Sequence, residues 1–155
     1  MRRCRCKMEN PSGTHLWLVL WKAYAACQSH ARRSIETLGM CYSDFAVLEC
    51  LLHKGSLPVN VIGDKVSLTS GSITTAVDRL QERGLVERQN SEEDRRAKIV
   101  ALTSKGKKLI KEAFQQHEVD MERLADSLSK KERAELVKLM KKIGKAAVSF
   151  AADPS

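Results

Sequence analysis

The stretch from Leu57 to Gly106 constrains the fold of this chain more than any other feature. Its residues predict, in order, a short helix, a tight turn, a second helix, a strand, a charged hairpin and a second strand. The hairpin adds a thin β-wing directly after the second helix. This order is typical of a winged helix-turn-helix, a shape that lays one helix in a major groove of DNA and a wing beside it.

The second helix of this unit, expected over 72–83, carries the candidate DNA-contacting face. Ser67 and Leu68 form the turn before it, and Thr69 or the next serine caps its start. The apolar side chains Ile73, Val77 and Leu80 recur with the helical period and predict a buried stripe. Short hydroxyl side chains and one arginine lie outside that stripe and can approach phosphates or base edges: Ser70, Ser72, Thr74, Thr75 and Arg79.

The polar segment 90–96 separates two expected strands at 85–89 and 98–102. Arg95 and Arg96 at the tip of a protruding wing are suited to a minor groove, where A·T-rich DNA concentrates negative potential. Asp94 has the wrong charge for DNA, but a carboxylate beside an arginine can hold the guanidinium in one rotamer. Such a charge run alone is usually a solvated loop, and its place after the helix-turn-helix favours the wing.

Long helical patterns flank this unit on both sides. Residues 14–38 carry one apolar stripe from Leu16 to Leu38 and a second stripe on another face, made of Trp17, Trp21 and Tyr24. A helix with two apolar faces needs two packing partners, so either a second subunit or one large core covers the second stripe. Thr103 begins another long helix, and a capping box at 129–132 begins the last one.

The charge balance favours an anionic partner. The 155 residues carry 27 basic and 19 acidic side chains, a net charge of +8 with a pI near 9.4. Four of the basic residues precede Met8, which is a possible alternative start. Without them, 23 basic residues against 19 acidic ones leave +4.

Several other functional classes lack a signal in the sequence. No run approaches the roughly 18 apolar residues of a membrane span. The five cysteines show neither the spacing of a disulfide framework nor that of a zinc site. No nucleophile–base pair, phosphate-binding loop or metal cluster is visible. We therefore expect a cytoplasmic protein without catalytic residues, metal or cofactor.

Three blocks of sequence, taken in order, resemble the MarR family of bacterial transcription regulators: Leu80–Arg88, Asp94–Ala97 and Leu102–Gly106. The resemblance runs from about His15 to Phe150. It implies a mainly α fold with a small two- or three-stranded β-wing. It also implies a homodimer with intertwined first and last helices, a recognition helix from Ser70, and Arg96 in the minor groove. Asp94 would orient Arg96, and Arg95 would lie near the DNA backbone.

This resemblance sets the expected organisation and partners. A disordered leader is expected at 1–13, dimerisation helices at 14–38 and 104–150, and the DNA-binding lobe at 39–103, all in one intertwined domain. The expected partner is a double-stranded, pseudo-palindromic operator, from which a small aromatic or phenolic ligand releases a homodimeric repressor. Candidate pocket residues are His15, Trp17, Trp21 and Tyr24, with core or dimer packing as the alternative for these side chains.

Cys41 supports an alternative mode of control. It stands where many members of the family have a threonine that caps the second helix, and a thiolate there is stabilised by the helix dipole and free amides. Redox sensing through Cys41 is therefore an alternative to a passive cap. Cys27, by contrast, is expected on a buried stripe. A winged helix that binds only a protein partner is a rival of another class, against which the hydroxyl-rich helix face and the arginine wing argue.

Overall fold

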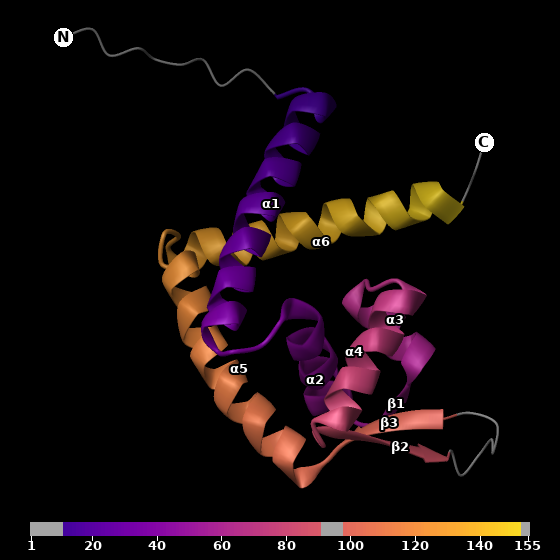
Figure 1. The fold of residues 1–155 in the computed structure, drawn as a ribbon. Coiled ribbons are helices and arrows are strands. Elements are labelled where there is room, and N and C mark those ends of the chain that lie inside the picture. The colour runs from indigo at the N-terminus through magenta and orange to yellow at the C-terminus, as the bar shows by residue number, and fades with distance from the viewer. Residues whose placement is uncertain (1–10, 91–97, 153–155) are drawn as a thin grey trace, which may run out of the picture. The chain divides into compact units, whose positions relative to one another are not determined.

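The computed structural model describes residues 11–90 and 98–152 (Figure 1). The chain divides into two compact units, and the boundary along the sequence lies between His117 and Glu118. The fold is mainly helical with one small sheet, as predicted. In chain order the elements are α1 (Gly13–Thr37), α2 (Tyr42–Lys54), β1 (Leu57–Pro58), α3 (Val59–Val66), α4 (Ser70–Glu82), β2 (Val86–Asn90), β3 (Lys98–Leu102), α5 (Ser104–Ala125) and α6 (Lys130–Ala152).

Ser67 and Thr69 mark the turn of the helix-turn-helix, between the end of α3 and the start of α4. Ser67 ends α3 in the left-handed conformation, with a φ of 54°, which reverses the chain between the two helices. Thr69 caps α4, because its hydroxyl accepts a hydrogen bond from the amide of Ser72 at 3.3 Å. The helix therefore starts at Ser70, two residues before the predicted boundary.

The sheet has three antiparallel strands in the order β1-β3-β2. The pair β2 and β3 forms the predicted hairpin, in register from Val86 opposite Leu102 to Asn90 opposite Lys98. The third strand is only two residues long, and its Pro58 pairs with Ile99 before serving as the N-cap of α3. The sheet thus connects directly to the first helix of the helix-turn-helix.

The core of the first unit is built around α2, whose Phe45 and Leu48 are almost wholly buried. The α4 side chains Ile73, Val77 and Leu80 pack into the same core, so the predicted buried stripe is confirmed. Strands and helix α5 complete this core with Val86, Val100 and Ile110. Because one side of α4 is buried, its opposite side is left to solvent.

The second unit contains the end of α5 and the whole of α6. Arg133 joins them, because its guanidinium bonds Glu122 at 2.6 Å, Asp126 at 2.8 Å and the carbonyl of Ala125 at 3.0 Å. The predicted capping box is present. Glu132 accepts from the hydroxyl of Ser129 at 2.6 Å and from its amide at 2.9 Å, and these hydrogen bonds lower the pKa of Glu132. None of the helices in the described residues combines the length and apolar content that a membrane span requires.

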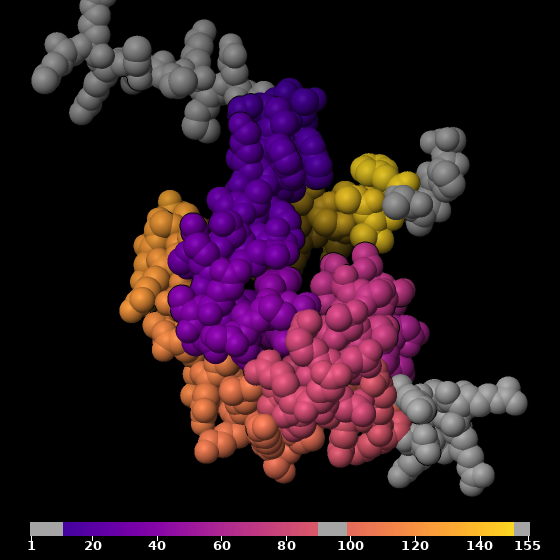
Figure 2. Space-filling view, in the orientation of Figure 1, coloured from indigo at the N-terminus to yellow at the C-terminus, as the bar shows by residue number. Residues whose placement is uncertain are grey.

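Helix α1 is buried only near its C-terminal end, where Ser34 and Ile35 pack into the first unit. Its N-terminal half stands clear of α2, α3 and α4 (Figure 2). Cys27 is exposed, so its predicted place on a buried stripe is wrong for the single chain. The reason is that the apolar stripe of α1 extends well beyond the part of the helix that its own unit covers.

Candidate nucleic-acid interface

The exposed side of α4 is lined by hydroxyl side chains. Ser70, Ser72, Thr74 and Thr75 are all exposed, as the sequence predicted. The hydroxyls of Thr74 and Thr75 donate to the backbone carbonyls of Ser70 and Gly71, each at 2.9 Å. These bonds hold the hydroxyls close to the helix and leave their oxygen lone pairs pointing outward as acceptors.

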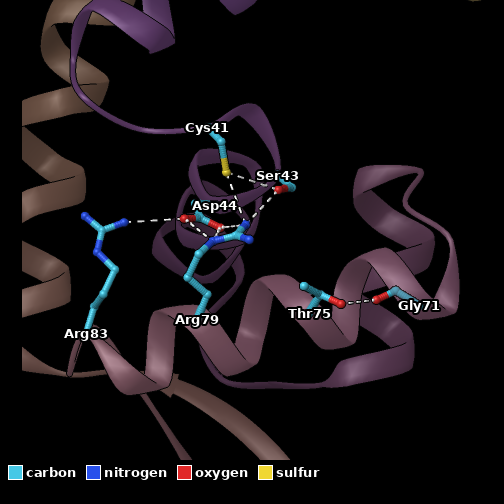
Figure 3. A network of polar contacts seen from close by, with 7 residues as sticks. All are labelled: Cys41, Ser43, Asp44, Gly71, Thr75, Arg79 and Arg83. Atoms are coloured by element: carbon cyan, nitrogen blue, oxygen red, sulfur yellow. Dashed lines mark hydrogen bonds and ion pairs between the residues drawn. The ribbon is translucent and has the colours of Figure 1, made fainter.

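An ion pair fastens one edge of α4 to the start of α2 (Figure 3). The Nε of Arg79 donates to both carboxylate oxygens of Asp44, at 3.1 and 3.0 Å, and its Nη2 also pairs with Oδ1. Arg83, one turn further along α4, reaches Asp44 Oδ2 at 3.4 Å. The hydrogen bond to Asp44 is the main cause that raises the pKa of Arg79 above its ordinary value. A buried carboxylate thus holds Arg79 of α4 and Arg83, the C-cap residue of that helix.

This arrangement changes how Arg79 is understood. The sequence assigned it to the DNA backbone, whereas the structure places its guanidinium against Asp44, whose side chain is only 2% exposed. The Arg79 side chain keeps 41% of its surface accessible, so a phosphate contact by Arg79 stays a prediction. Sequence reasoning missed Asp44. The available signal was an acidic residue within the apolar stretch of α2, which needs a cationic partner when it is buried.

A second ion pair joins the other edge of α4 to β2, the first strand of the hairpin. Arg88 of β2 donates from Nη1 to Gln81 Oε1 at 2.7 Å and from Nη2 to Asp78 Oδ1 at 2.5 Å. Thr74, Asp78 and Gln81 follow each other at four- and three-residue steps, so they lie along one edge of the helix. Nothing in the local sequence pattern had singled out Arg88, because it lies at an ordinary strand position.

A surface hollow of about 810 Å³ lies between the end of α1, the start of α2 and the exposed side of α4. Thr75 and Arg79 of α4 line it, as do Arg32 and Tyr42. The Arg32 guanidinium carbon lies 4.7 Å from the centre of the Tyr42 ring, a cation–π contact. Cationic and aromatic groups therefore meet at a hollow that also reaches α4.

Cys41 lies in the same hollow and is the N-cap residue of α2, as predicted, but its side chain forms no capping hydrogen bond. The thiol is exposed instead, and its Sγ lies 3.2 Å from Arg79 Nη2 and 3.3 Å from Ser43 Oγ. Cys41 therefore contacts the arginine that joins α4 to α2.

The four candidate pocket residues do not line the hollow beside α4. His15, Trp17, Trp21 and Tyr24 are all exposed along α1, and the described hollow has no contribution from them. The three aromatic rings keep between 56% and 62% of their surfaces accessible. Any pocket made from these side chains would need walls from outside this unit.

The wing residues Asp94, Arg95 and Arg96 lie outside the described residues, so their roles stay predictions. The strands on either side are described, and Asn90 pairs with Lys98 at the end of the hairpin next to this segment. The segment that carries the three charged residues therefore begins and ends at paired positions.

The proposed leader at 1–13 likewise falls largely outside the described residues, and α1 begins at Gly13.

Comparison with known proteins identifies the family. A model of the MarR family matches residues 42–98. The HTH-type transcriptional regulator MhqR of Bacillus subtilis (strain 168) is 37% identical over 135 residues, which cover 87% of this chain and 93% of that protein. The chain belongs to the MarR family. The resemblance seen in the sequence is confirmed, and this MarR-family chain is a DNA-binding transcription regulator with a winged helix.

Solved structures of MarR-family and other transcription regulators share the fold. Transcriptional regulator PA4135 is 25% identical with a TM-score of 0.74, over 87% of this chain and 97% of that one. BpsR of Bordetella bronchiseptica, whose DNA binding is regulated by 6-hydroxynicotinic acid, is 23% identical with a TM-score of 0.71. That match covers 81% of this chain and 90% of BpsR, and it shows similarity of fold alone.

Proposed function

We propose that this chain is a homodimeric repressor that binds a pseudo-palindromic operator and leaves it when a small molecule binds. The observation that carries the proposal is the exposed hydroxyl face of α4, bordered by two ion pairs and followed by an antiparallel hairpin. On this proposal α4 lies in the major groove, with Ser70, Ser72, Thr74 and Thr75 near base edges or phosphates. Asp94, Arg95 and Arg96 lie in or beside the adjacent minor groove.

Exposed apolar surface supports a homodimer. On α1 the side chains of Trp17, Trp21 and Tyr24 are more than half exposed, and on α6 Leu139 is 51% and Phe150 78% exposed. Large exposed apolar surface on a single chain marks an interaction site. We assign both helices to contact with a second copy, in agreement with the dimerisation segments proposed at 14–38 and 104–150. A two-fold symmetric dimer reads two half-sites about one helical turn apart.

For the effector we propose a small aromatic anion, and the hollow beside α4 supports this choice. Arg32 and Arg79 supply two positive charges there against the one negative charge of Glu36, and Tyr42 supplies an aromatic ring. A ligand bound there would lie against Thr75 and compete for the groups that hold or present the recognition helix. The pocket suggested by the sequence, at His15, Trp17, Trp21 and Tyr24, becomes the alternative if a second copy closes it.

Ligand binding can be assigned to one of these two places with intrinsic fluorescence, since Trp17 and Trp21 are the only tryptophans. An aromatic carboxylate bound at the hollow should lose affinity in Arg79→Gln and keep it in Trp21→Phe. The pocket on α1 predicts the reverse. Binding that neither substitution changes would contradict both assignments.

The test of DNA binding starts from a pool of random-sequence duplexes and the full-length protein. We expect one palindromic sequence to be enriched and bound at least about a thousandfold more tightly than a scrambled duplex. Arg96→Ala should weaken that binding about tenfold or more, and Asp94→Ala should weaken it too. Lys108→Gln, which removes a charge from an exposed site on α5, is the matched control. A monomer by light scattering at micromolar concentration, or no enriched sequence, would refute the proposal.

A thiol switch at Cys41 is the second candidate, because this thiol is exposed and contacts Arg79. A hydroperoxide would oxidise the thiol to a sulfenic acid while the peroxide is reduced to water or an alcohol. The added oxygen would crowd Arg79 and disturb the contact between α2 and α4. Mild peroxide should then lower operator affinity in the wild type but not in Cys41→Ser. Equal losses in both proteins would exclude Cys41 as the sensor.

On either candidate the chain acts in the cytoplasm, where the chromosome is accessible, and binds DNA rather than catalysing a reaction. Neither candidate requires a metal or cofactor. The DNA-binding experiment separates these regulators from a protein-interaction module, because a module of that kind would enrich no duplex.

A further inference from the structure

The exposed face of α4 is bordered by two ion pairs of opposite polarity. On one edge the helix supplies the cations, and Asp44 of α2 accepts from Arg79 and Arg83. On the other edge the helix supplies the acceptors, and Arg88 of β2 donates to Asp78 and Gln81. The first pair joins α4 to the helical core, whereas the second joins it to the strand that leads into the wing.

The contact made by Arg88 is suited to fixing the angle between α4 and the hairpin that contains β2. Two separate nitrogens of its planar guanidinium bind acceptors almost one helical turn apart, which defines a direction as well as a distance. Arg88 also pairs with Val100 within the hairpin, so its backbone is held by the sheet. Its side chain is 25% exposed and that of Asp78 is 50% exposed.

This exposure indicates that the contact adds little to stability. Ion pairs between solvent-accessible side chains contribute about 0–1 kcal/mol, because water screens them and ordering long side chains costs entropy. The hydrophobic contacts of α4 already hold it in the core. The specific effect of Arg88 is therefore on the orientation of α4 relative to the base of the wing, the two parts that must meet DNA together.

We propose that Arg88 is a positioning residue for operator recognition, which acts by holding Asp78 and Gln81 and so sets the angle between the recognition helix and the wing. This inference rests on the proposed function, since it needs a duplex that both parts contact. Arg88 need not touch DNA itself. Its effect should appear in the discrimination between operator and other sequences more than in general attraction to DNA.

The test compares Arg88→Gln, Asp78→Asn and the double variant on the duplex that the wild type enriches. Each single substitution should weaken operator binding roughly tenfold, and the double variant should be no weaker than the singles, because all three lose the same contact. The result for Asp78→Asn is the most informative one. Charge alone predicts tighter binding when a carboxylate is removed from a DNA-facing surface, whereas a positioning role predicts weaker binding.

Three further measurements separate positioning from other roles. Binding to a scrambled duplex should be unchanged in all variants, whereas loss of folded protein would weaken both duplexes alike. The salt dependence should also stay the same, since loss of a direct phosphate contact lowers the slope by about 0.9. Arg88→Lys, which keeps the charge but not the fork, should lie between the wild type and Arg88→Gln. Lys108→Gln again controls for the loss of one positive charge.

The outcomes are distinct. If the wild type enriches no duplex, the proposed function fails and the role of Arg88 in recognition fails with it. If the wild type binds its operator but Asp78→Asn binds as well or better, only the positioning role is overturned. Additive losses in the double variant, about a hundredfold in all, would show that the two residues contact DNA independently and would overturn it equally.

Discussion

The pair between Asp44 and Arg79 predicts that its two partners are unequally costly to remove. Both side chains take part in the same hydrogen bonds, but Asp44 is 2% exposed and Arg79 is 41% exposed. A truncation leaves the other partner behind, and the cost depends on whether that partner can regain water. The relevant comparison is therefore between Arg79→Ala, which leaves a buried carboxylate, and Asp44→Ala, which leaves two accessible guanidinium groups.

The structure sets the approximate magnitudes. Removing one member of a buried pair costs about 3–5 kcal/mol of unfolding free energy. Arg83 still reaches the Asp44 carboxylate at 3.4 Å, so we expect about 3.5 kcal/mol for Arg79→Ala. Asp44→Ala loses charge-assisted hydrogen bonds and a favourable charge in the first turn of α2, but the remaining arginines regain solvent. We expect about 2 kcal/mol for that variant.

Urea unfolding followed by circular dichroism measures both values. The double variant should be more stable than Arg79→Ala alone, because the second substitution removes a buried carboxylate that keeps only the long contact with Arg83. Thr75→Ala is the control on the same helix, since this exposed hydroxyl bonds only the backbone of its own helix among the described contacts. If Asp44→Ala proved as destabilising as Arg79→Ala, the explanation by unequal solvation would be wrong.

Three other predictions follow from local geometry. A Cβ at Gly106 would lie 1.9 Å from the carbonyl oxygen of Leu85, so Gly106→Ala should cost about 1–3 kcal/mol or more and lower the thermal midpoint by several degrees. Since hydrogen bonds from Ser129 lower the pKa of Glu132, their stabilisation should be present above the ordinary glutamate value of about 4.3 and disappear as the pH falls through the lowered pKa. The loss of helicity in Ser129→Ala should therefore be larger at pH 7 than at pH 2, where only the cap from the Glu132 amide to the Ser129 hydroxyl remains to be lost. Burial raises the pKa of Cys50, so iodoacetamide at pH 8 should label this thiol more slowly than the exposed thiols of Cys27 and Cys41. Peptide mass mapping measures the three labelling rates, and equal rates would contradict the burial of Cys50.

The winged helix-turn-helix could be predicted from the sequence because its signals are local. Apolar residues at helical spacing predicted the buried side of α4, and Thr69 was one of the two residues expected to cap its start. Two short strand-forming segments on either side of a polar, turn-forming segment predicted the hairpin. The contacts that border the recognition helix could not be predicted in the same way. Asp44 and Arg79 are 35 residues apart, and no periodic pattern relates a side chain in one helix to its partner in another.

Helix α1 shows a different limit, because periodicity identifies an apolar stripe but not the surface that covers it. The first unit buries Ser34 and Ile35, and the same stripe continues toward the N-terminus through Cys27 to Leu16, where the side chains are exposed. Burying a large apolar side chain is worth about 1.5–3 kcal/mol, so a helix that exposes this many of them gains substantially from any surface that excludes water. A second copy of the chain presents the same stripe, and two-fold symmetry lets each copy cover the other. The aromatic residues of α1 that the sequence suggested as a ligand pocket would then lie at or near that contact, so dimer formation and any ligand binding at α1 would depend on the same side chains.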